Sequence, residues 1–144
     1  MNIVDIEKIG RDLSVRAYLA TADDQGVPHV VPVHPAWEGP TIWVMTSLTT
    51  VKARNIEANH QVAMHWETND AGDGLLVQGT AAIVTDLNTK TRLWSGVFDY
   101  DLSAFAPDGP GTPDVAFLRI EPHRAVHALG YGAGGVQRWK AESA

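Results

Sequence analysis

The chain has 144 residues, of which 44% are hydrophobic and 19% are charged, and its formal net charge at pH 7 is −6. This composition is typical of one globular domain, and the absence of cysteine excludes disulfides, thiolate zinc sites and a thiol nucleophile. The negative charge argues against non-specific nucleic-acid binding, and no apolar run is long enough to span a membrane. Residues Met1–Asp5 lack the basic start of a signal peptide, so we expect a cytoplasmic protein.

The hydrophobic pattern predicts a mostly β fold with peripheral helices. Apolar residues at helical spacing predict a short amphipathic helix over residues 3–11. Alternating residues then predict a hairpin with strands over 15–22 and 28–36 and a turn at Gly26. Further strands are expected at 41–46, 61–67, 75–86 and 115–126, with helices at 50–58 and 88–98. Six strands joined mainly by hairpin turns favour a six-stranded antiparallel barrel.

Proline and glycine mark the irregular segments. Prolines at positions 28, 32 and 35 predict a strand that lies at a sheet edge, is bulged or loses pairing locally. Such a strand either protects an edge against aggregation or frees backbone groups for a bound ring system. Gly79 predicts a bulge in the strand at 75–86. The loop at 99–113, with an exposed Phe105, is long enough to be functional or to pack on a partner. We expect one domain, with its core over about 13–128 and a flexible tail over 129–144.

Hydroxyl residues and a lysine surround the start of the helix at 50–58, namely Ser47, Thr49, Thr50 and Lys52. Hydroxyl side chains commonly cap helices, and a helix start presents free N–H groups with partial positive charge. Together with the lysine, such a start could bind a phosphate or another anion. A capped surface helix whose lysine points into water explains the same residues, and from this segment alone it is the commoner outcome.

A metal site is one hypothesis that the histidines suggest. His123 and His127 have the i, i+4 spacing of a metal-binding helix. Arg124 stands where the glutamate of a zinc hydrolase motif would lie, and the segment continues a predicted strand, where this spacing separates the two rings. We therefore expect no metal. No nucleophile elbow, Walker loop or dinucleotide fingerprint occurs in the sequence.

Two segments carry a family pattern: Ala20–Val33 continuing to Lys52–Asn59, and Ala104–Asp114 followed by Leu118–Pro122. In this order they resemble the pyridoxamine 5'-phosphate oxidase-like, FMN-binding split-barrel superfamily. The second segment is similar to the general stress protein branch, which has a Trp-Phe-Pro-x-Gly-Pro-x-Asp-Pro signature at this point. The resemblance covers most of residues 15–125. It implies a split-barrel homodimer with two FMN sites at the subunit interface.

The resemblance also implies which residues hold the cofactor. The segment along the flavin and ribityl chain would be His29, Val30, Val31, Pro32 and Val33, followed by His34. His29 and His34 stand where the oxidase pattern has cationic Arg and Lys. The ring edge would lie over Met45 and Thr46, and the phosphate side would be formed by Thr46, Ser47, Thr50 and Lys52. Phe105, the aromatic residue of the second segment, completes the predicted site.

The sequence also departs from the family pattern. Val51 replaces a second phosphate-binding cation, so we expect a low affinity for FMN. The aromatic pair of the second segment is reduced to Ala104-Phe105, with Ala106 before the proline. A glutamine expected near Gly74 and the C-terminal segment that binds the substrate phosphate are both missing. Oxidation of pyridoxamine phosphate is therefore not expected.

Three hypotheses about function remain open. The first is an FMN-dependent oxidoreductase acting on a small molecule, in which the flavin supplies the hydride chemistry and no side chain need act as acid or base. The second keeps the fold but uses the deazaflavin coenzyme of actinobacterial relatives. The third is a non-enzymatic flavin-binding stress protein. The sequence identifies neither the substrate nor the electron donor.

Overall fold

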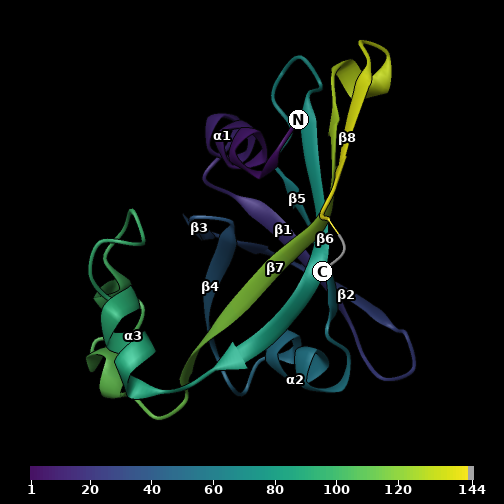
Figure 1. Cartoon of the computed structure of the whole chain (residues 1–144). Coiled ribbons are helices and arrows are strands. Elements are labelled where there is room, and N and C mark those ends of the chain that lie inside the picture. Colours follow the sequence, from purple (N-terminus) through teal and green to yellow (C-terminus); the bar gives the residue numbers. More distant parts are fainter. Residues whose placement is uncertain (143–144) are drawn as a thin grey trace.

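An antiparallel sheet curls into a half-barrel at the centre of the structure, a computed structural model that describes residues 1–142 (Figure 1). The strands within this range are β1 (Ala17–Ala22), β2 (Pro28–Val33), β3 (Ala36–Glu38), β4 (Thr41–Ser47), β5 (Gln61–Trp66), β6 (Gly74–Val84), β7 (Val115–Ala128) and β8 (Val136–Lys140). Seven of them follow the order β2-β1-β5-β6-β7-β4-β3, and β8 pairs with β7. The predicted mostly β, split-barrel fold is confirmed, but the sheet of residues 1–142 has eight strands where six were expected, because β3 pairs with β4 as a separate strand and β8 adds to β7.

Short helices surround the sheet. The α-helices are α1 (Ile3–Leu13), α2 (Val51–Ala58) and α3 (Leu87–Leu93), and the 3₁₀ turns are η1 (Leu102–Ala104), η2 (Gly109–Gly111) and η3 (Gly130–Gly132). Helix α1 starts in a capping box, in which Asn2 Oδ1 accepts from Asp5 N and Asn2 N donates to Asp5 Oδ2. Helix α3 is shorter than predicted, because the chain turns at Gly96 with a φ of 87°. No helix within residues 1–142 is long and apolar enough to cross a bilayer.

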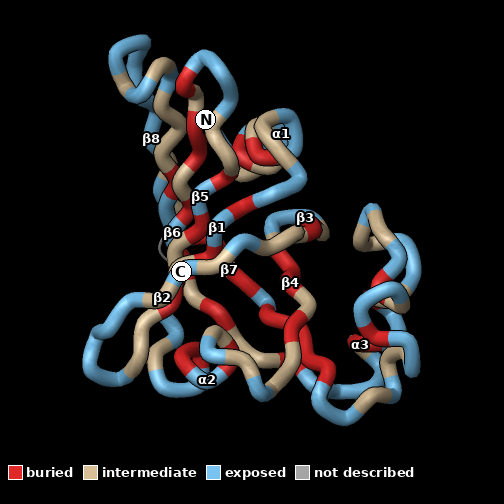
Figure 2. The backbone as a smooth tube through the Cα atoms, turned by 180° about the vertical axis from the view of Figure 1, so that it is seen from behind, coloured by how far each residue is buried: buried red, intermediate tan, exposed pale blue. Residues whose placement is uncertain are grey.

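Two hydrophobic clusters fill the interior (Figure 2). The main core packs α1 and α2 against the sheet, and its largest fully buried members include Ile6, Leu19, Ile42, Ile56, Met64, Trp66, Leu75, Leu118 and Ile120. The second cluster lies between β4, β7 and residues 87–114, which we call the side lobe. Its buried members are Trp43, Val84, Leu93, Leu102, Ala106, Val115 and Phe117. The side lobe is therefore fixed to one end of the sheet by its own small core.

The strand predicted at 28–36 is two strands with different partners. Strand β2 ends at Val33 and pairs with β1, whereas β3 begins at Ala36 and pairs with β4. Pro35 stands between them, and because proline has no N–H it cannot continue the ladder. Strand β2 lies at one end of the strand order, so its predicted position at a sheet edge is confirmed.

The C-terminal segment differs from the flexible tail expected over 129–144. Residues Val136–Lys140 form β8, which pairs with β7 in the register Ala125↔Trp139. The partly buried Trp139 packs on the main core, and this burial of a large aromatic surface holds the strand. The end of the expected tail, residues 143–144, lies outside the described residues.

The predicted bulge at Gly79 is confirmed. The register of β6 against β7 shifts between Gln78 and Gly79, next to Pro122 on β7. A Cβ atom at position 79 would lie 2.1 Å from the carbonyl oxygen of Glu121. Only glycine allows the two backbones to approach so closely.

Replacing this glycine tests the close approach of β6 and β7. We expect Gly79→Ala to lower the free energy of unfolding by at least about 2 kcal/mol, because the strands must separate to admit the methyl group. Urea unfolding followed by circular dichroism measures the change. Gly111→Ala is the matched control, since a Cβ atom at position 111 would meet nothing within 4 Å, and it should change stability by less than about 0.5 kcal/mol. Equal stabilities of the two variants would contradict the register.

Candidate functional site

A cavity of about 540 Å³, which we call the main cavity, lies between the sheet and the side lobe. The end of β2, strand β4 and the start of α2 form one wall, and the side lobe forms the other. Nine of the twelve residues predicted from the sequence line it, namely Pro32, Val33, His34, Met45, Thr46, Ser47, Thr50, Lys52 and Phe105. The fold thus brings together segments more than 50 residues apart in the sequence.

The other three predicted residues, His29, Val30 and Val31, do not line the main cavity. Successive residues of a strand point to opposite faces, and 63% of Val30 is exposed on the outer face of β2. His29 pairs in register with Thr21, whose hydroxyl accepts from Asn55 Nδ2 at 3.1 Å on the inner side. The cavity therefore meets only the C-terminal end of β2.

Eight residues that line the main cavity were not predicted as part of the site. They are Val44 on β4, Val115 at the start of β7, and Tyr100, Ala106, Pro107, Asp108, Thr112 and Asp114 of the side lobe. The pairing of Ser47 with Val115 in the β4–β7 ladder brings the side lobe to the cavity. The length of the loop at 99–113 and the family segment at 104–114 indicate a role for this loop, but its place beside α2 depends on a strand pairing across about 70 residues.

Lys52 is a half-buried cation at the start of α2. Burial lowers the pKa of its ammonium group below the ordinary value, and no neighbouring carboxylate offsets this effect. Thr50 caps the helix, since its hydroxyl accepts from Ala53 N at 3.3 Å. The first-turn N–H groups of Val51 and Lys52 have no acceptor within the helix. This arrangement favours an anion, which would restore charge balance to the lysine and pair the free donors.

A carboxylate lies near this possible anion site, which consists of Lys52 and the start of α2. Asp114 Oδ2 accepts from Ser47 Oγ at 3.2 Å, and Asp114 O accepts from Leu48 N at 2.8 Å. The Ser47 hydroxyl is thus directed toward the side lobe. We infer that an anion in the cavity would be held mainly by Lys52 and the start of α2.

Aromatic and apolar side chains form the remainder of the main cavity. The Tyr100 ring lies 4.3 Å from the His34 ring and 5.6 Å from the Phe105 ring, measured between centroids. Burial, and then the charge of Asp99, raise the pKa of the Tyr100 phenol, so it stays neutral. Phe105 is 72% exposed at the edge of the cavity, opposite Met45 on the sheet wall. Such surfaces suit a planar ring.

Lys90 fastens the side-lobe wall from behind. It is buried in α3, and its Nζ donates to Thr112 O at 3.0 Å and to Val115 O at 2.9 Å. A buried ammonium without a hydrogen-bond partner would be costly, so these two carbonyl groups satisfy it and are themselves held in place. Because Thr112 and Val115 line the main cavity, Lys90 fixes one wall of the site without facing it.

The comparisons with known proteins identify the family. The chain matches the family model described as pyridoxamine 5'-phosphate oxidase over residues 13–127, and it belongs to this family. General stress protein 26 of Bacillus subtilis (strain 168) is 30% identical over 125 residues, which make up 85% of this chain and 80% of that protein. The suspected family is therefore confirmed.

Solved structures share the fold at low sequence identity. A protein from Clostridium acetobutylicum related to general stress protein 26 has a TM-score of 0.77 and 17% identity, covering 96% of this chain and 93% of its own. A pyridoxamine 5'-phosphate oxidase-related, FMN binding protein from Nostoc punctiforme PCC 73102 has a TM-score of 0.69 and 18% identity, covering 95% and 86%.

Structures with this fold carry names that indicate different ligands. One described as an F420 reductase is 26% identical, with a TM-score of 0.57, and the match covers 77% of this chain and 88% of its own. A heme binding protein from Mycobacterium smegmatis has a TM-score of 0.75 and 14% identity, covering 97% and 58%. The fold alone therefore does not identify a ligand, and the residues of the main cavity must do so.

The role of Lys90 can be tested by hydrogen exchange. We expect Lys90→Met to speed amide exchange in residues 109–115 at least tenfold, because the carbonyl groups of Thr112 and Val115 lose their buried donor. Exchange in β5 and β6 should stay unchanged. Mass spectrometry of peptic fragments measures both regions. Lys8→Met is the control, since Lys8 is exposed and pairs only with Asp12 one turn along α1. Unchanged exchange at 109–115 in Lys90→Met would contradict the role of Lys90.

Proposed function

We propose that this chain binds FMN in the main cavity and acts as a flavin-dependent oxidoreductase on a small molecule. The observation that carries the proposal is Lys52, a half-buried cation at a helix start that forms no ion pair with a carboxylate of residues 1–142. Among the described residues that line the main cavity, Lys52 is the only Lys or Arg. A ligand with one phosphate group and a planar ring matches a site with one such cation and an aromatic wall.

The residues present fit FMN. The volume of about 540 Å³ lies within the roughly 300–1,000 Å³ of small-molecule sites. Lys52 and the N–H groups at the start of α2 would hold the phosphate, while Val33, Met45 and Phe105 would contact the ring and the ribityl chain. When bound, FMN supplies hydride transfer at its isoalloxazine ring. The protein orients the ring, excludes water and sets the charge around it. The FMN binding protein from Nostoc punctiforme supports this choice of ligand.

A deazaflavin coenzyme is the second candidate ligand. The F420 reductase with the same fold favours it. Such a coenzyme also carries a phosphate and a planar ring, so Lys52 and the aromatic wall would serve it in the same way. An absorbance spectrum from about 300 to 550 nm, taken after loading with each coenzyme separately and desalting, distinguishes the two. Retention of neither coenzyme would remove both candidates and would leave Lys52 on a capped surface helix.

We also propose a homodimer that closes the main cavity. The strand registers place two rows of residues across the outer face of the sheet. One row is Pro32, Tyr18, His65, Leu76 and Val126, and the next is Val30, Ala20, Ala63 and Gln78. Most of these side chains are apolar, and Tyr18 and Val30 are exposed. Because Pro32 belongs both to this face and to the main cavity, a second copy on this face would border the ligand.

Removal of the lysine tests the phosphate site. We expect Lys52→Ala to weaken FMN binding at least tenfold, which corresponds to about 1.4 kcal/mol, because the phosphate loses its one permanent cation. Quenching of flavin fluorescence during a titration measures the dissociation constant. Arg54→Ala is the control, since it removes the same charge from an exposed position of α2 outside the cavity. Equal affinities of wild type and Lys52→Ala would contradict the assignment.

A charged residue introduced on the outer face of the sheet tests whether this face forms the dimer interface. We expect the wild-type chain to be a dimer at micromolar concentration in light scattering, and Val30→Glu to be a folded monomer, because a carboxylate would be buried against an apolar surface. Val4→Glu serves as the control, since Val4 is 67% exposed on α1, away from the two rows. A monomeric wild-type protein would contradict the proposed assembly.

A further inference from the structure

His34 lies between two cavities. It lines the main cavity together with Tyr100 and Lys52, and it also lines a smaller one of about 120 Å³. No other described residue lines both cavities. The imidazole is therefore the one side chain in this part of the chain through which a proton could pass from one cavity to the other.

The His34 ring is held from two sides. Its buried Nε2 lies 2.7 Å from Asp99 Oδ1, although the ring N–H is not aligned for a hydrogen bond, so the contact is chiefly ionic when the imidazole is protonated. The ring also packs on Tyr100 at 4.3 Å with an interplanar angle of 31°. Because Asp99 occupies the Nε2 side, Nδ1 is the nitrogen left for a proton transfer.

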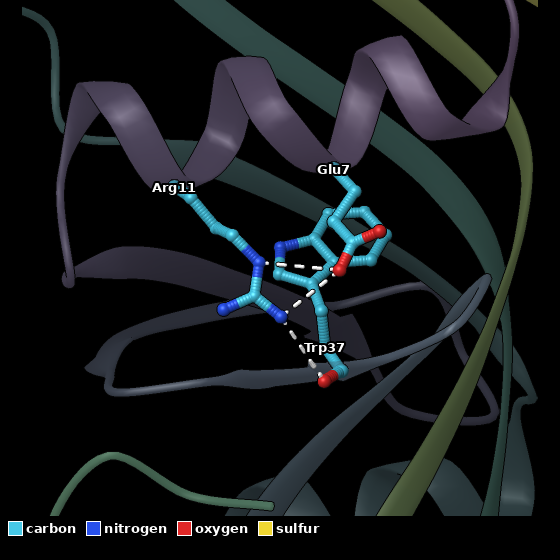
Figure 3. A network of polar contacts seen from close by, with 3 residues as sticks. All are labelled: Glu7, Arg11 and Trp37. Carbon is cyan, nitrogen blue, oxygen red and sulfur yellow. Dashed lines mark hydrogen bonds and ion pairs between the residues drawn. The ribbon is translucent and has the colours of Figure 1, made fainter.

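The smaller cavity is polar enough to hold water. Arg11, Ser14 and Asp99 line it, as does Trp37, whose buried indole N–H has no hydrogen-bond partner among residues 1–142. Arg11 is fixed at this place, since its guanidinium donates to Glu7 Oε1 at 2.9 Å and to Trp37 O at 3.3 Å (Figure 3). A polar cavity of this size with several donors and acceptors suits ordered water.

We propose that His34 donates a proton to the substrate that is reduced in the main cavity, and that Asp99 positions its ring. The inference rests on the proposed function. In this step the substrate accepts a hydride from reduced flavin and a proton from His34 Nδ1. The N–H bond of the imidazolium breaks, a new bond to hydrogen forms on the substrate, the flavin returns to its oxidised state, and the imidazole becomes neutral. The vacated Nδ1 then takes up a proton from water, which restores the imidazolium.

Charged groups on every neighbouring element surround His34. Asp99, in the loop at 99–113, contacts the ring. Arg11 of α1 lines the smaller cavity with His34, and Lys52 of α2 lines the main cavity with it. Asp108 and Asp114 line the main cavity on the side-lobe wall, and the neutral Tyr100 lies against the ring. Of these groups, only Asp99 is in contact with an imidazole nitrogen, so its charge is the one that favours a proton on Nε2.

Two electron acceptors separate proton transfer from electron transfer. Reduced, FMN-loaded protein is mixed with menadione, which takes up protons with its electrons, or with ferricyanide, which takes up electrons alone. We expect His34→Gln to slow the menadione reaction at least tenfold more than the ferricyanide reaction, as for loss of a general acid. Asp99→Asn should slow the menadione reaction by a smaller factor. His60→Gln, which removes an exposed histidine outside both cavities, is the control.

The position of the proton on the His34 ring can be measured without any turnover. Nitrogen-15 NMR of the protein without FMN should show neutral His34 with its proton on Nε2, and Asp99→Asn should remove this preference. The flavin affinity of His34→Gln is measured as well, so that the reaction rates are compared at equal flavin loading.

Three outcomes would overturn the proposal. Equal slowing of both acceptors in His34→Gln, no slowing of either, or a proton on Nδ1 in the wild-type protein would each remove His34 from this role. A wild-type protein that retains no FMN after desalting would instead overturn the proposed function, and the inference with it. Retention of FMN by the wild-type protein therefore distinguishes an error in the proposed FMN site from an error in the proposed role of His34.

Discussion

The pairing of β4 with β7 is the constraint on which the site depends. Ile42 lies opposite Ile120 at one end of this ladder, and Ser47 lies opposite Val115 at the other. The side chains of both isoleucines are fully buried in the main core, so a shift by one residue would turn them out toward the other face. The same register delivers the end of the side lobe to the start of α2. The cavity is thus a consequence of how the core fixes one strand pair.

The two walls of the main cavity have opposite electrostatic character. The sheet wall carries Lys52 at the start of α2, where burial makes its charge costly unless an anion accompanies it. The side-lobe wall carries Asp108 and Asp114. A phosphate at one end of a ligand would pair with Lys52 on the sheet wall. A neutral ring in the same ligand can lie along the aromatic side chains between the two walls. The side lobe is held by its own core and by the buried Lys90, so this division of charge is built into the fold.

Local patterns explain the parts of the structure that were predicted from the sequence. The amphipathic spacing of α1, the capping hydroxyl of Thr50 and the glycine at position 79 each depend on neighbours in the chain or on the backbone itself. The continuous strand at 28–36 did not form, because the chain changes partners at Pro35. The segment at 136–140 became a strand because β7 offered a free edge and Trp139 found a surface to cover.

The sequence by itself determined the mostly β architecture, the family and nine of the twelve predicted residues of the main cavity, since periodicity, turn residues and short motifs are local properties. The tertiary structure decided which other residues meet them there. Tyr100, Asp99 and the buried Lys90 belong to the side lobe, and their contacts with His34, Thr112 and Val115 exist only once β7 has paired with β4. Pairing between distant strands depends on the packing of the whole core, so no local pattern could have placed these residues at the cavity.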